Sequence, residues 1–231
     1  MKRTGIMLAA GEATRMPNKA LLPVNPQGRL VIETGLDFLK ASQCDDVIII
    51  VKPDTGLEYV MSMMGRQCNF AYQVNATGPL AAINIGASCI PADEYLVAFC
   101  DNIYTPSVEF VGRTELAWMY PRASVRKVPE VLLPACDWWD PFHKEWTSRR
   151  LSIGRCGDDN LSFAGWLLLS QSHINAFRGS EGTRVLGLPM HQYLQHMKAT
   201  PVVCAPNTWH DAGTPESYIA FLKEMNRARS L

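Results

Sequence analysis

Short apolar segments alternate with segments of helical periodicity over the first 100 residues, and this alternation constrains the fold more than any other feature. The run at 46–51 (DVIIIV) is β-branched and apolar on both faces, as the central strands of parallel sheets are. Further strands are expected at 4–10, 68–74 and 95–100, separated by helices at 30–42, 54–64 and 79–90. This order predicts an α/β fold in which helices cover both faces of an open, mostly parallel sheet.

Ligands of such sheets bind at the carboxyl ends of the strands. Gly11, Gly78 and Asp101 each come after an expected strand, so all three are expected at the same edge. The second half of the chain is less regular. We expect strands at 116–135 and 161–170, no clear periodicity over 136–160, and a final helix at 215–229.

The charges of the chain balance, with 22 Lys and Arg residues against 22 Asp and Glu residues and a formal net charge of zero. This balance disfavours a disordered chain and a nucleic-acid-binding protein, which is usually basic. Only 19% of the residues are charged, below the roughly 25% of typical domains. Because low surface charge accompanies buried subunit contacts, we expect a homo-oligomer.

Seven cysteines are scattered without a CxxC pair, which excludes a zinc ribbon and a thioredoxin-type motif. We interpret them as the reduced thiols of a cytoplasmic protein. The apolar run Ile6–Ala10 is too short for a secretory signal. No run of about 20 apolar residues is present, so no membrane span is expected.

The loop after the first strand presents two cations four residues apart, Arg15 and Lys19. Small residues before them would let backbone N–H groups approach a polyphosphate closely. Arginine can bind phosphate oxygens with its forked guanidinium, and lysine is a mobile point charge. An ordinary loop with two solvated cations is the alternative.

The segments 8–16 (LAAGEATRM) and 18–24 (NKALLPV) together resemble LAAGxGTRMxP…PKxLLPV, the signature of the sugar-1-phosphate nucleotidyltransferases, which include glucose-1-phosphate thymidylyltransferase. The resemblance implies a three-layer, Rossmann-like (GT-A-like) nucleotidyltransferase fold. It also implies catalytic roles for Arg15 and Lys19. Two departures are Ala13 in place of the second Gly and Asn18 in place of the Pro, and the stretch between the two cations is shorter. The nucleotide-binding residues implied in this loop are Leu8, Ala9, Ala10, Gly11, Ala13 and Thr14.

Gln73 lies five residues before Gly78, a spacing that the family also has where both residues approach the nucleobase. Glutamine offers a donor and an acceptor to a base edge. The resemblance therefore implies that both residues bind the nucleotide. A polar loop before a helix is the alternative, and the base itself is not determined.

The family's GDN(I/L) turn corresponds to 100–103, with Cys100 in place of Gly, and its W-x-D-x-G-T-P-E-S segment corresponds to 209–217. The resemblance makes Asp101 and Asp211 the ligands of Mg²⁺, an ion that binds one or two carboxylates together with substrate phosphates. Its implied sugar-binding residues are Asn102 and Gly165, although Phe163 replaces the Asn usual before that glycine.

The family's Glu-Lys-Pro element has no clear counterpart here, and Lys127 is a candidate for the displaced lysine. The stretch 136–160 instead contains Trp138, Trp139, Trp146, Arg149 and Arg150. These side chains are interpreted either as a remodelled acceptor pocket or as an oligomer contact, where Trp and Arg are enriched.

The function implied is the condensation of an NTP with a sugar 1-phosphate, which gives an NDP-sugar and pyrophosphate. One alternative is nucleotidyl transfer to a non-sugar phosphate such as phosphocholine, for which the tryptophans would form an aromatic cage. The other is a catalytically inactive, nucleotide-binding regulatory subunit. We expect a single domain over 1–231, with a nucleotide-binding half at about 1–105 and an acceptor-binding half at about 106–231.

Overall fold

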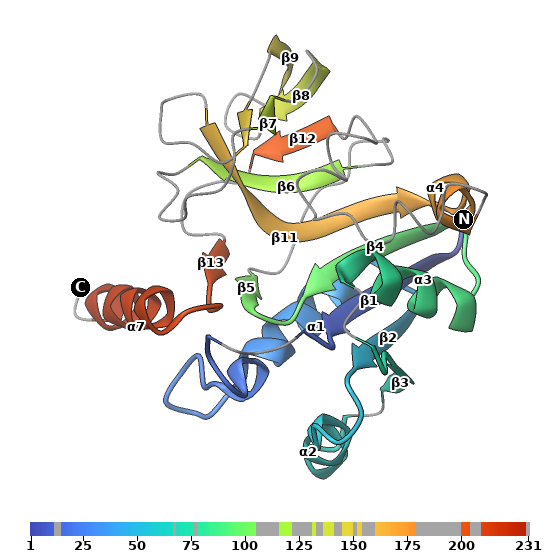
Figure 1. Ribbon diagram of the computed structural model, residues 1–231. Helices are drawn as coiled ribbons and strands as arrows, with labels where there is room; N and C mark the ends of the chain where they lie inside the picture. The colour runs from blue at the N-terminus through green and yellow to red at the C-terminus, as the bar shows by residue number, and fades with distance from the viewer. Residues whose placement is uncertain are drawn as a thin grey trace.

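The N-terminal strands form a parallel sheet, as predicted. In the computed structural model, β1 (Arg3–Ala9) lies between β2 (Asp46–Val51) and β4 (Glu94–Phe99), and β3 (Asn69–Tyr72) pairs with β2, all in parallel (Figure 1). Each strand begins and ends within a few residues of its predicted range. The three-layer nucleotidyltransferase fold with a mostly parallel sheet is confirmed.

The structure describes the chain as follows. Backbone and side chains are described for 1–11, 15–66, 68–75, 78–104, 165–175 and 210–227. The backbone alone is described for 116–121, 131–132, 136–140, 145–149, 152–153, 160–164, 176–178, 200–203, 209 and 228–229.

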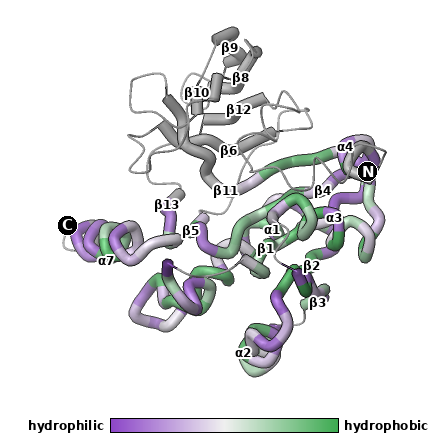
Figure 2. Tube along the Cα trace, in the orientation of Figure 1, coloured by the Kyte–Doolittle hydropathy of each residue, from purple (hydrophilic) through white to green (hydrophobic). Residues whose placement is uncertain are grey.

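Helices α1 (Val31–Ala41), α2 (Leu57–Met63) and α3 (Pro79–Cys89) connect the parallel strands. Neighbouring residues of β1 enter different cores, because side chains along a strand alternate between its faces. Ile6 packs in the core beneath α3, and Met7 in the core beneath α1 and α2. Helices therefore cover both faces, as predicted. Figure 2 shows hydrophobic residues along β4 and the described part of β11 (Asn160–Ser170).

The second half extends the same sheet beyond β4, in the order β4-β11-β6-β12-β8-β9. The strand β11 is antiparallel to β4 and to β6 (Leu116–Pro121), and helix α4 (Gln171–Arg178) follows it. The register of β11 against β6 shifts between Phe163 and Leu167, so the pairing of the two strands is irregular in the stretch that contains Gly165. The strands expected at 116–135 and 161–170 are confirmed by β6, β7 (Val131–Leu132) and β11.

The stretch 136–160 contains strands that its sequence did not predict. The strand β8 (Cys136–Asp140) pairs with β9 (Glu145–Arg149) in antiparallel fashion, and β10 (Ser152–Ile153) pairs with β11. The strand β12 (Thr200–Val203) lies between β6 and β8. In DWWD and EWTSR, polar and apolar residues do not alternate with period 2, so the usual strand signal is missing.

A separate two-stranded ribbon brings distant parts of the sequence together. The strand β5 (Asn102–Tyr104) pairs antiparallel with β13 (Trp209–Asp211), and the predicted C-terminal helix follows as α7 (Pro215–Arg229). Asp211 lies opposite Asn102 in this ribbon. Among the described residues, no helix is long and apolar enough to cross a membrane. The cytoplasmic location, the oligomeric state and the division into two halves stay predictions.

Candidate active site

A cavity of about 420 Å³ opens at the carboxyl edge of the parallel strands, where the sequence predicted it. This volume lies in the range of small-molecule sites, about 300–1,000 Å³. Gly11, Gly78 and Asp101 all line it. The predicted nucleotide-binding residues that line it are Leu8, Ala9, Ala10, Gly11, Gln73 and Gly78, whereas Ala13 and Thr14 lie outside the described residues.

Lys19 enters this cavity from the first turn of the short helix η1 (Lys19–Leu21). Before it, Asn18 adopts the left-handed conformation (φ 54°, ψ 23°), and its carbonyl accepts a hydrogen bond from the Leu21 N–H at 2.8 Å. Asparagine tolerates this region, whereas proline, with φ fixed near about −65°, cannot enter it. The departure from the family's Pro-Lys pair thus has a structural reason.

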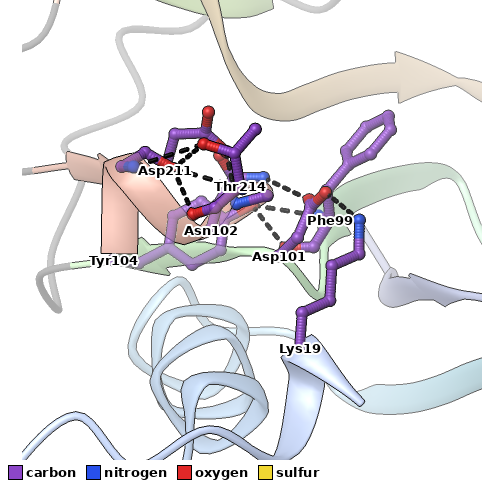
Figure 3. A network of polar contacts seen from close by, with 9 residues as sticks. Lys19, Phe99, Asp101, Asn102, Tyr104, Asp211 and Thr214 are labelled. Atoms are coloured by element: carbon purple, nitrogen blue, oxygen red, sulfur yellow. Dashed lines mark hydrogen bonds and ion pairs between the residues drawn. The ribbon is translucent and has the colours of Figure 1, made fainter. Parts of the chain in front are cut away.

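The ammonium group of Lys19 forms an ion pair with Asp101, with 2.5 Å between Nζ and Oδ2 (Figure 3). The two side chains are 17% and 22% exposed, so the pair is partly shielded from solvent. Arg15, the other predicted cation, is exposed and is not among the residues that line the cavity.

Gln73 and Gly78 are in direct contact. The Gln73 side-chain amide donates to the Gly78 carbonyl at 3.0 Å, and the Gln73 backbone N–H donates to Val51 O at 2.9 Å. Gly78 has a φ of 93°, which favours glycine, and Pro79 begins α3 immediately after it. The pair fixes one wall of the cavity.

The turn from β4 to β5 carries the predicted metal ligand Asp101. Its Oδ1 atom accepts a hydrogen bond from the Asn102 side chain at 2.9 Å, so both carboxylate oxygens have partners. Cys100 is buried, and burial raises its thiol pKa to about 12. The thiol therefore stays protonated and packs as a small apolar group.

Asp211 is brought next to this turn by the β5–β13 ribbon. The Ala212 N–H donates to the Asp101 carbonyl at 2.8 Å, and Asp211 Oδ1 accepts from the Gly213 N–H at 2.7 Å. Thr214 caps α7, because its Oγ1 accepts from the Ser217 N–H at 3.2 Å. The predicted pair of carboxylates therefore comes from adjacent backbone segments.

The donor set suits Mg²⁺, which takes hard oxygen ligands and commonly uses one or two carboxylates with substrate phosphates. Asp101 lines the cavity and lies beside the segment that carries Asp211. Among the described residues, no group of three or more His, Cys, Asp and Glu side chains could hold a metal ion.

Gly165, a predicted sugar-binding residue, lies against Asn102. Its φ is 82°, and a Cβ atom added there would lie 2.5 Å from the Asn102 side-chain nitrogen. Asn102 is itself buried. Only glycine fits this close approach, and the structure thus brings together the two residues assigned to the sugar.

Tyr104 is a component of the site that the sequence did not single out. Its hydroxyl accepts from the Phe99 N–H at 2.9 Å (Figure 3). The same hydroxyl donates to the Gly165 carbonyl at 2.5 Å, and the ring stacks on Phe38. Burial raises the pKa of this hydroxyl well above its ordinary value, which keeps it a donor. In the sequence, nothing distinguishes this tyrosine from an ordinary core residue.

The predicted acceptor residues of the second half lie outside the described side chains. This applies to Lys127, Trp138, Trp139, Trp146, Arg149, Arg150 and Phe163. Their assignment to an acceptor pocket or to an oligomer contact stays open.

Residues 5–111 match the protein family described as the MobA-like NTP transferase domain. The N-terminal part of the chain is therefore similar to the nucleotidyltransferase domains of this family. The matched segment includes the first loop, the Gln73–Gly78 pair and Asp101, and it confirms the resemblance to nucleotidyltransferases. No protein of curated function is similar to the chain in sequence.

Two solved structures share the fold of this chain. One is described as a glucose-1-phosphate thymidylyltransferase from Bacillus anthracis in complex with a sucrose, at 19% identity and a TM-score of 0.69, covering 96% of this chain and 94% of that one. The other is a UDP-glucose pyrophosphorylase complexed with UDP-glucose, at 15% identity and a TM-score of 0.70, covering 99% of this chain and 100% of that one. At these identities the likeness shows the fold.

Proposed function

We propose that this protein is a nucleotidyltransferase that condenses an NTP with a sugar 1-phosphate to give an NDP-sugar and pyrophosphate. The observation that carries the proposal is the convergence of three predicted elements on one cavity. Gly11 and Lys19 from the two ends of the first loop, the Gln73–Gly78 pair, and Asp101 line the same 420 Å³ space.

The chemistry follows from the charges at this edge. An oxygen of the sugar phosphate attacks the α-phosphorus of the NTP, and the bond from that phosphorus to the bridging oxygen of the β-phosphate breaks. Pyrophosphate leaves with the electron pair. Because the nucleophile is already an anion, no general base is needed, and catalysis rests on alignment and charge neutralisation.

Each predicted residue has a role in this scheme. Lys19 places its ammonium group among the phosphates, and Arg15, at the exposed mouth of the loop, neutralises the leaving pyrophosphate. Gln73 and Gly78 orient the nucleobase. Asp101 and Asp211 would hold Mg²⁺, which supplies charge neutralisation to the phosphate oxygens.

Two observations support a sugar phosphate as the acceptor. The two structurally similar proteins are a glucose-1-phosphate thymidylyltransferase and a UDP-glucose pyrophosphorylase. In this chain, Asn102 and Gly165, the residues that the resemblance assigns to the sugar, lie in contact beside Asp101.

A panel assay of pyrophosphate release tests the proposal. The purified protein is mixed with Mg²⁺, each of the common NTPs in turn, and either sugar 1-phosphates or phosphocholine. We expect release that depends on a sugar 1-phosphate. Pyrophosphate release with phosphocholine and with no sugar 1-phosphate would show that phosphocholine is the acceptor. Absence of release in every mixture, with NTP binding intact, would favour a regulatory subunit. Asp101→Asn protein, purified in parallel, corrects for contaminating activity.

A further inference from the structure

Lys19 and Asp101 form an ion pair at the edge of the cavity. The Lys19 ammonium lies 2.5 Å from Asp101 Oδ2, and the Asn102 amide occupies Oδ1. A divalent cation at Asp101 requires these same oxygens. Because the pair is only 17% and 22% exposed, water screens the attraction less than it would at the surface.

We propose that Lys19 is a placeholder cation. In the free protein it occupies Asp101 and opposes metal binding. Lys19 leaves the carboxylate only when the phosphates of a nucleotide offer its ammonium group a stronger partner. The metal site is thus completed by the arrival of the nucleotide. This inference rests on the proposed function, because it assigns the metal to Asp101 and the phosphates to Lys19.

The side chain and its setting suit an exchange of partners. The lysine stem is flexible and its ammonium group donates equally well to a carboxylate or a phosphate, whereas its backbone is anchored by Asn18 and the turn of η1. Lys19 and Asp101 both line the cavity, so the ammonium group can reach a bound ligand without any movement of the chain.

The donor set points the same way. Within the described part of the chain, no cluster of three or more metal-binding side chains exists. A cation at Asp101 and Asp211 would need further oxygens, and a triphosphate brings them. By thermodynamic linkage, a nucleotide that releases Asp101 raises the metal affinity, and the metal raises the nucleotide affinity by the same factor.

Direct metal binding tests the inference without using activity. Mn²⁺ stands in for Mg²⁺, and free Mn²⁺ is counted by electron paramagnetic resonance, with and without an NTP analogue whose α,β-bridge is methylene. The proteins are wild type, Lys19→Met, Lys19→Arg and Lys19→Met combined with Asp101→Asn. Lys19→Gln repeats the neutral substitution if Lys19→Met does not fold, and thermal unfolding checks each protein.

Without nucleotide, we expect Lys19→Met to bind Mn²⁺ at least about tenfold more tightly than wild type, the size of a typical coupling between sites. The charged Lys19→Arg should remain weak, and Asp101→Asn should remove the gain. Equal Mn²⁺ affinity of wild type and Lys19→Met would overturn the placeholder role, as would a gain that survives Asp101→Asn. If no protein bound Mn²⁺ even with the analogue, the metal assignment of the proposed function would fail as well.

Discussion

The hydroxyl of Tyr104 donates a hydrogen bond to the carbonyl of Gly165 at 2.5 Å and thereby ties the turn that carries Asp101 to strand β11. The same hydroxyl accepts from the Phe99 N–H. One buried side chain therefore holds the nucleotide side of the site to the strand that contains the predicted sugar-binding glycine. Since burial raises its pKa, this link persists over the ordinary working pH range.

Tyr104→Phe keeps the ring stacked on Phe38 but removes the hydroxyl. We expect a loss of about 1–3 kcal/mol in the free energy of unfolding, because two buried backbone groups lose a partner. We also expect kcat to fall more than the KM for NTP rises, since the lost hydroxyl bonds to Gly165 on the predicted sugar side of the site. Urea unfolding and steady-state kinetics check both. If kcat is unchanged in a destabilised protein, Tyr104 contributes to stability and not to turnover.

Asp101→Asn preserves the shape of the side chain and removes the charge. We expect turnover in Mg²⁺ to fall roughly a thousandfold, because several kcal/mol of charge stabilisation is lost. The fold should persist, and circular dichroism with thermal unfolding is the control. Turnover near that of wild type would show that Asp101 does not hold the metal.

Asn18 is required for its left-handed backbone, with φ at 54°. Asn18→Gly accepts that conformation and should keep the KM for NTP within about twofold of wild type. Asn18→Ala should lower the free energy of unfolding by about 1 kcal/mol. Asn18→Pro should displace Lys19 and abolish turnover. A fully active Asn18→Pro protein would contradict this account of the loop.

Cys44 and Cys89 should differ in their reactivity as thiols. Burial raises the pKa of Cys44 to about 12, whereas Cys89 is exposed. Since the thiolate is the reactive form, only about one Cys44 side chain in ten thousand is ionised at pH 8. Iodoacetamide at pH 8 should therefore modify Cys89 before Cys44, as peptide mass spectrometry would record. Equal rates in the folded protein would contradict the burial of Cys44.

Much of the fold was predictable because its parallel strands are buried on both faces. The run DVIIIV at 46–51 became β2 without a change of bounds, and Gly78-Pro79 marked the start of α3. The strands β8 and β9 were missed because polar and apolar residues do not alternate regularly along CDWWD and EWTSR, which leaves no apolar periodicity to detect.

The site residues were predictable from sequence alone only where they lie close together in the chain. The Arg15–Lys19 loop and the Gln73–Gly78 pair each lie within a few residues of sequence. The neighbourhood of Asp101 and Asp211 depends on pairing between β5 and β13, more than 100 residues apart, which only the family resemblance could supply. The link from Tyr104 to Gly165 had no sequence signal, because a buried aromatic residue is usually part of the core.

The position of the bond that breaks tests the central claim most directly. Phosphorus NMR of an incubation with Mg²⁺, NTP and a sugar 1-phosphate resolves every phosphate product. We predict that pyrophosphate and the paired resonances of a sugar-linked diphosphate appear in equal amounts, while the NTP and sugar 1-phosphate decline together. Formation of NDP and inorganic phosphate, with the sugar 1-phosphate unconsumed, would contradict nucleotidyl transfer.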